Sequence, residues 1–88
     1  MQNLKVGDVV FVGRQEDKKG SAGLFFFVNG LRRNAPAPGT KATRVGPEVP
    51  DEEGEWKFRN PSEWENAHLG AAEWLTGGEQ FAITETPL

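Results

Sequence analysis

The sequence contains no cysteine and only one histidine in 88 residues. Without cysteine the chain can form neither a disulfide nor a thiolate metal site, so hydrophobic packing and any oligomerisation have to stabilise the fold. No apolar run approaches the roughly 18 residues that a membrane-spanning helix needs. The first residues, MQNLKVGDVV, also lack the apolar segment of a signal peptide. We therefore expect one soluble, cytoplasmic domain over residues 1–88, with no membrane partner.

The residue patterns that catalysis requires are equally scarce. His68 follows Glu65 by three residues, but carboxylate-bridged metal bundles need this Glu-x-x-His pair twice. Ser62 and His68 would point to different sides of a helix, which does not favour a Ser-His pair. The segment KKGS at 18–21 has the wrong order for a phosphate-binding loop. We expect no enzyme activity, no metal site and no small-molecule cofactor.

Charge is divided unevenly along the chain, although the net charge is only −3. Residues 1–47 carry eight Lys and Arg against three acids, which gives +5. Residues 48–88 carry two basic residues against ten acids, which gives −8. Such a division is typical of a nucleic-acid-binding face or of a surface for an acidic partner. It also arises when the two halves neutralise each other in the folded domain.

Strands are predicted throughout the first half of the chain. Leu4–Gly13 is rich in β-branched residues, with a bend or bulge at Gly7, and a polar loop follows over Arg14–Ala22. Leu24–Val28 is the second strand. Asn29-Gly30 favours a type I′ turn, which returns the chain as a short third strand over residues 31–34.

The second half begins with a long loop over residues 35–54, which is rich in proline, glycine and acids. Within it, Lys41–Val45 alternates weakly and is predicted as an edge strand, and Asp51–Glu55 is predicted as a solvated turn. The alternation in Glu55–Arg59 places two aromatic side chains inside. A final strand is expected over residues 80–85.

Between these strands, the pattern predicts a helix over residues 61–75. Asn60 suits the N-cap position, Pro61 the first helical position, and Glu63 completes a capping box. Gly77-Gly78 provides a C-terminal stop. At about 100° per residue, one side of this helix collects Trp64, Ala67, His68, Ala71, Trp74 and Leu75. We expect this side to be buried against the sheet, with His68 partly buried at its margin.

These elements indicate an α+β fold. We expect a strongly bent antiparallel sheet, or a small SH3-like or OB-like barrel, of five to six short strands with the helix 61–75 packed on it. The segment KVGDVVFVG at 5–13 resembles the first strands of SH3-like and OB-like barrels.

The segment Phe25–Asn34, FFFVNGLRRN, concentrates aromatic surface at one point. With a period of two, Phe26 points to one face of the strand and Phe25 and Phe27 to the other. A strand that is apolar on both faces has to be covered on both, and the helix 61–75 can cover only one. Either closure of a barrel or another molecule has to cover the second face.

Exposed phenylalanines forfeit roughly 1.5–3 kcal/mol each, so this surplus apolar face favours a non-enzymatic interaction module. We expect it to dock a protein partner, or a second copy of itself, through the hairpin 24–34 and the adjoining basic loop. The alternative is a small barrel that binds single-stranded nucleic acid by base stacking and phosphate contacts, although a pI of about 5.1 disfavours it. Either function would use Phe25, Phe27, Arg32, Arg33, Arg14, Lys18 and Lys19.

Overall fold

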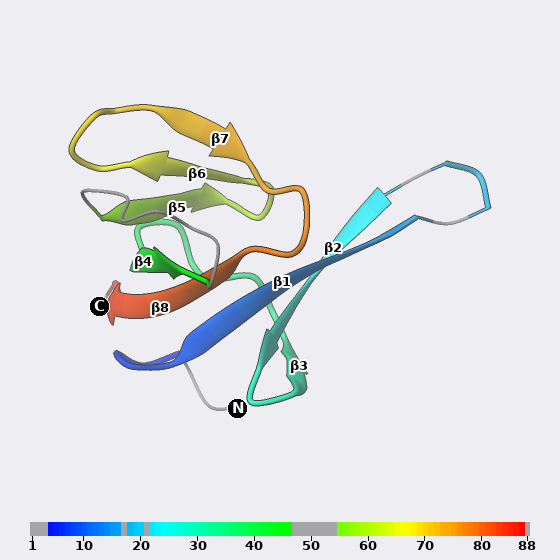
Figure 1. The fold of residues 1–88 in the computed structure, drawn as a ribbon, viewed down its shortest axis with the longest axis horizontal. Helices are drawn as coiled ribbons and strands as arrows, with labels where there is room; N and C mark the ends of the chain where they lie inside the picture. The colour runs from blue at the N-terminus through cyan, green and yellow to red at the C-terminus, as the bar shows by residue number, and fades with distance from the viewer. Residues whose placement is uncertain (1–3, 17, 21, 47–54, 88) are drawn as a thin grey trace.

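The computed structural model describes residues 4–16, 18–20, 22–46 and 55–87, and these residues form an all-β fold (Figure 1). None of the described residues is helical. The strands are β1 (Val9–Glu16), β2 (Ala22–Val28), β3 (Leu31–Arg33), β4 (Lys41–Val45), β5 (Trp56–Asn60), β6 (Glu63–Asn66), β7 (Ala72–Trp74) and β8 (Gln80–Glu85).

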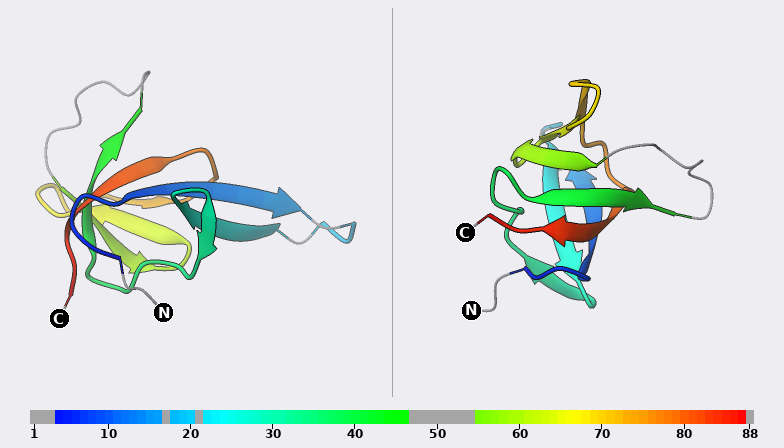
Figure 2. Two further views of the ribbon diagram at one scale, coloured as in Figure 1. Left: turned by 90° about the horizontal axis from the view of Figure 1, so that it is seen from below. Right: turned by 90° about the vertical axis from the view of Figure 1, so that its left-hand side faces the viewer.

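All eight strands belong to one antiparallel sheet with the order β3-β2-β1-β8-β4-β5-β6-β7. The last strand therefore lies in the middle of the sheet, where Val10 of β1 pairs with Phe81 of β8. The sheet is strongly bent, because Trp64 of β6 reaches back to Phe81, with ring centroids 4.1 Å apart, although β4 and β5 lie between their strands. Figure 2 shows β1 and β2 extending beyond the rest of this sheet as a long hairpin.

The concave face of the bent sheet holds the hydrophobic core. Alternate residues of the strands supply it, which confirms the inward positions predicted for Trp56, Phe58, Phe81 and Ile83. Aromatic rings contact one another across the strands: Trp56 stacks on Trp64 with centroids 4.7 Å apart, and the Phe58 ring meets the Phe81 ring edge-on at 5.1 Å. The buried apolar residues are Val10, Val12, Phe26, Val28, Ala42, Trp56, Phe58, Trp64, Leu75, Phe81 and Ile83.

The predicted helix over residues 61–75 is wrong, and the segment forms the hairpin of β6 and β7 instead. Asn60 does not cap a helix; its side-chain oxygen accepts a hydrogen bond from the Ser62 N–H at 2.8 Å, within the turn that joins β5 to β6. This Asx-type bond uses the same chemistry as a helix N-cap. Trp64 then pairs with Phe58 of β5 and enters the core.

A second asparagine closes the β6–β7 hairpin. The side-chain oxygen of Asn66 accepts hydrogen bonds from the N–H groups of His68 and Leu69, each at 2.9 Å. His68 is consequently exposed in a turn rather than partly buried, and Gly70 adopts a positive φ of 71°. Trp74, which was expected on the buried side of a helix, is 67% exposed.

Several boundaries also differ from the sequence prediction. The first strand begins at Val9 rather than Leu4, and it continues to Glu16 through residues expected in a loop. Residues 41–45 do form a strand, but β4 lies between β8 and β5 rather than at an edge. The expected loop 35–54 is therefore interrupted by a strand, and residues 47–54, including most of the expected acidic turn, lie outside the described residues.

The fold class is accordingly all-β and not α+β. The described residues form one open, bent antiparallel sheet of eight strands, where a bent sheet or barrel of five to six strands with a helix was expected. The difference arises because the segment 61–75 contributes two strands instead of a helix. The Asn29-Gly30 turn is as predicted, with positive φ values of 54° and 77°. The described residues contain no helix of the length and apolar character needed to cross a membrane.

Candidate interaction surface

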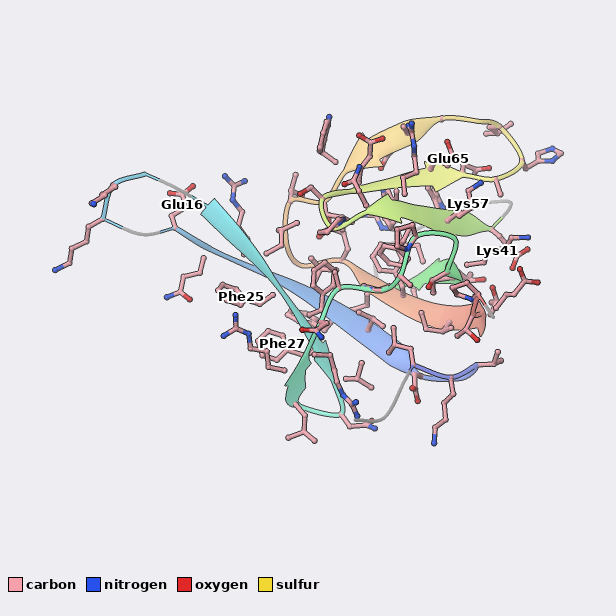
Figure 3. All side chains as sticks on the ribbon, turned by 180° about the vertical axis from the view of Figure 1, so that it is seen from behind. Glu16, Phe25, Phe27, Lys41, Lys57 and Glu65 are labelled. Atoms are coloured by element: carbon pink, nitrogen blue, oxygen red, sulfur yellow. The ribbon has the colours of Figure 1, made fainter. Side chains whose placement is uncertain are left out.

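The convex face of β1, β2 and β3 carries the phenylalanines that the core does not use. Val10 and Val12 enter the core, so the intervening Phe11 points to the opposite face. The register places Phe27 directly beside Phe11 on one side and beside Arg32 of β3 on the other. Figure 3 shows Phe25 and Phe27 on the side of β2 that faces away from β5 and β6.

These side chains form one continuous cluster. The rings of Phe11 and Phe27 lie 6.5 Å apart between centroids, and the Arg32 guanidinium carbon lies 4.2 Å from the centre of the Phe25 ring. Gly13 lies beneath the rings, since a Cβ atom there would come within 3.3 Å of the Phe27 ring. We call Phe11, Phe25, Phe27 and Arg32 the aromatic patch.

The aromatic patch is only partly covered. Phe25 and Phe27 are half-buried by their neighbours within the patch, whereas Phe11 is 41% exposed and the adjacent Val9 44% exposed. The sheet is open and its core lies on the other face, so no second layer of described strands packs on the patch. The expected division of Phe25 and Phe27 from Phe26 is thus confirmed, and barrel closure does not bury them.

The convex face of the other half of the sheet is charged, and its charges are paired. Lys57 of β5 contacts Glu65 of β6 at 3.2 Å, and Lys41 of β4 contacts Glu85 of β8 at 3.4 Å (Figure 3). Arg59 adds a contact of 2.7 Å to Glu63. Of these pairs, only the contact between residues 41 and 85 joins the basic first half of the chain to the acidic second half.

The structure brings together only some of the residues predicted to form a site. Phe25, Phe27 and Arg32 lie in the aromatic patch, together with Phe11, which was not among the predicted site residues. The alternation of VVFVG in the first strand could have identified Phe11, because Val10 and Val12 occupy the opposite face.

The other predicted site residues lie elsewhere. Arg14 pairs with Leu24 on the core side of the hairpin, where its guanidinium contacts Glu16 at 3.3 Å. Arg33 pairs with Phe26 and therefore also points to the concave side. Lys18 and Lys19 lie at the tip of the β1–β2 hairpin, which projects away from the body of the molecule (Figure 1). The seven residues consequently do not form one surface.

A groove runs beside β2, where β3 ends. It encloses about 290 Å³. Its lining comes from β2, from β3 and the residues after it, and from the β5–β6 turn. We call it the edge groove. The residues that line it are Leu24, Phe25, Phe26, Arg32, Arg33, Asn34, Ala35, Pro61 and Ser62.

Nothing in the described part of the chain is arranged to hold a metal ion, because no three of its His, Asp and Glu side chains gather at one place. No protein-family model, curated protein sequence or solved structure matches the chain. Its function therefore has to be argued from the fold, the aromatic patch and the edge groove.

Proposed function

We propose that this protein is a small, non-enzymatic interaction module that docks a protein partner, or a second copy of itself, through the aromatic patch. The observation that carries the proposal is the position of Phe25 and Phe27 on the convex face, opposite the core, with Phe11 exposed beside them. An apolar cluster of this kind, flanked by charged surface, is typical of a protein-binding site.

The energetics favour an interface over a purely structural role. Complete burial of a phenylalanine contributes roughly 1.5–3 kcal/mol relative to exposure, and the three rings of the patch have only part of that burial in the free chain. A partner that covers them recovers the remainder. The paired charges on β4, β5 and β6 offer no comparable gain, because their ion pairs are already formed.

Binding of single-stranded nucleic acid remains the second candidate, supported by the presence of Arg32 among the phenylalanines. It is the weaker one. Base stacking needs an exposed ring face, but the guanidinium of Arg32 already lies over one face of Phe25 at 4.2 Å. Three of the cations that were expected to hold phosphates, Arg14, Lys18 and Lys19, also lie away from the patch.

A photo-crosslinking amino acid at Phe11 tests the proposal in the cells that make the protein. We expect discrete adducts with a protein from position 11. The same group at Lys57, on the charge-paired half of the convex face, should give none. Equal labelling from both positions, or adducts with nucleic acid only, would contradict the proposal.

Two measurements on the purified protein separate the remaining outcomes. Light scattering during size-exclusion chromatography reports whether the partner is a second copy. In that case the measured molar mass would rise from the monomer value toward twice that value as the protein concentration increases. Titration with a single-stranded oligonucleotide at several salt concentrations reports on the second candidate. Phosphate contacts give a steep loss of affinity with salt, whereas an apolar interface does not.

A further inference from the structure

We propose that the edge groove binds an extended, acidic peptide segment of a partner protein, which adds to the sheet as a strand beside β2. This inference rests on the proposed function, because it takes the partner to be a protein. It goes further by naming the binding mode, which is β-strand addition, and the side-chain chemistry that the partner has to carry.

The direction of the backbone groups of β2 follows from hydrogen bonds on its neighbour. The N–H of Val12 donates to the Glu79 carbonyl at 2.9 Å, and the Val12 carbonyl accepts from the Gly78 N–H at 2.6 Å. Both groups of Val12 therefore point away from β2. Phe26 is the antiparallel partner of Val12, so its own N–H and carbonyl point away from β1.

Leu24 precedes Phe26 by two residues and therefore presents its backbone groups to the same side. There β3 pairs with β2 only at residues 26–28, and no described strand pairs with β2 beside Leu24. A strand edge with unpaired N–H and carbonyl groups is a template for an added strand. The edge groove is lined by Leu24 and Phe26 of this part of β2 and also by Pro61 and Ser62.

The charge of the groove indicates which kind of peptide segment it binds. Its lining includes Arg32 and no Asp or Glu. Arg32 makes no ion pair with another described residue and is held against the Phe25 ring. A guanidinium that is fixed in this way matches a carboxylate side chain in two-point geometry. An acidic residue on the added strand would provide that carboxylate.

A second copy of the chain fits the groove less well than an acidic segment does. Pairing of β2 with β2 of a second copy would place the segment Ala22–Val28 in the groove. This segment is apolar and carries no carboxylate that could meet Arg32. We therefore assign the groove to a different protein.

The test uses the full chain with isotope label and a short capped peptide that alternates valine or threonine with glutamate. We expect the peptide to slow hydrogen exchange of the Leu24 amide by at least about tenfold, because that N–H becomes part of a ladder. A matched peptide with lysine in place of glutamate should bind at least about tenfold more weakly, and Arg32→Glu should weaken the glutamate peptide to a similar extent. Lys5→Glu, an exposed control outside the groove, should leave its affinity unchanged.

Each contrary result has a defined meaning. No binding of the glutamate peptide, or binding without protection of the Leu24 amide, overturns strand addition. It leaves the interaction module intact if Phe11 still gives protein adducts. Equal binding of the lysine peptide overturns the acidic specificity. The Leu24 amide could instead be protected from hydrogen exchange without peptide, to a degree that rises with protein concentration. That result would assign the groove to a second copy and overturn our choice of occupant.

Discussion

Gly77 lies in the connection from β7 to β8, where it packs against Arg14 of β1 and the absence of a side chain is required. Its φ is +97°, and a Cβ atom at this position would come within 2.8 Å of the Arg14 Cβ. The neighbouring Gly78 has a similar φ of +93° but open space around it. A comparison of alanine substitutions at the two positions therefore distinguishes the cost of backbone strain from the cost of steric overlap.

We expect Gly77→Ala to destabilise the protein by about 1–3 kcal/mol more than Gly78→Ala. Both substitutions place alanine at a positive φ, which costs about 1–2 kcal/mol, but only the first also forces a crowded contact. Urea unfolding of the two variants measures the difference. Equal stabilities would show that the β1 backbone moves away from Gly77 without cost.

A second residue-level prediction separates the two faces of the sheet. Phe81 is completely buried, whereas Phe11 is 41% exposed on the convex face. We expect Phe81→Ala to cost about 3–5 kcal/mol and Phe11→Gln to cost less than about 1 kcal/mol while removing partner binding. Unfolding of both variants gives the stability readout, and crosslinking from a photoreactive amino acid at the neighbouring, exposed Val9 gives the binding readout. A large loss of stability in Phe11→Gln would indicate that the patch is structural.

Among the elements, the hairpin of β6 and β7 shows why a helix was predicted wrongly. Asn60-Pro61-Ser62-Glu63 satisfies the local rules for a helix start, but the same Asn60 hydrogen bond to the Ser62 N–H also forms a turn. Gly70 would cost a helix through this segment about 1 kcal/mol relative to alanine, and in the hairpin it adopts a positive φ. The deciding contribution comes from distant residues, because Trp64 gains Trp56 and Phe81 as ring partners only when the segment is a strand.

The strands that could be predicted were those whose side chains alternate strongly by themselves. Residues 55–59 and 80–85 alternate with large apolar groups, whereas residues 24–28 are apolar throughout and are bounded by the Asn29-Gly30 turn. Each of the three forms a strand near its predicted place. Residues 72–74 are exposed at every position, so the period of two is not visible there. The candidate site was predictable to a similar extent. The two-residue period of a strand places Phe25 and Phe27 on the face opposite Phe26, but it does not show where β3 ends along β2, and the edge groove depends on that end.

We expect Asn66→Ala to weaken the β6–β7 hairpin by about 1–3 kcal/mol. The side chain is 3% exposed and accepts two backbone hydrogen bonds, from His68 and Leu69. Asn60→Ala is the control, because this asparagine accepts one backbone bond, in the exposed turn before β6, and should cost about 1 kcal/mol or less. Chemical unfolding compares the two variants, and a larger loss from Asn60→Ala would contradict the expected order.

For the molecule as a whole, the convex face is divided between two kinds of surface. The strands β4, β5, β6 and β8 carry paired charges, and the strands β1, β2 and β3 carry the aromatic patch. Most of these ion pairs lie within the second half of the chain, and the pair between residues 41 and 85 joins the two halves. The basic side chains of the first half are scattered, since Arg14, Lys18 and Lys19 lie away from the aromatic patch, and this scatter disfavours one nucleic-acid-binding face.

The pairing of β1 with β8 also has a consequence for synthesis. The nascent chain can form the β1–β2–β3 meander early, but Val10 stays without its β8 partner Phe81 until residues 80–85 have left the ribosome. At about 5–20 residues per second, that delay lasts several seconds. During this interval β2 exposes phenylalanines on both faces, so the unfinished chain is a better chaperone substrate than the finished one.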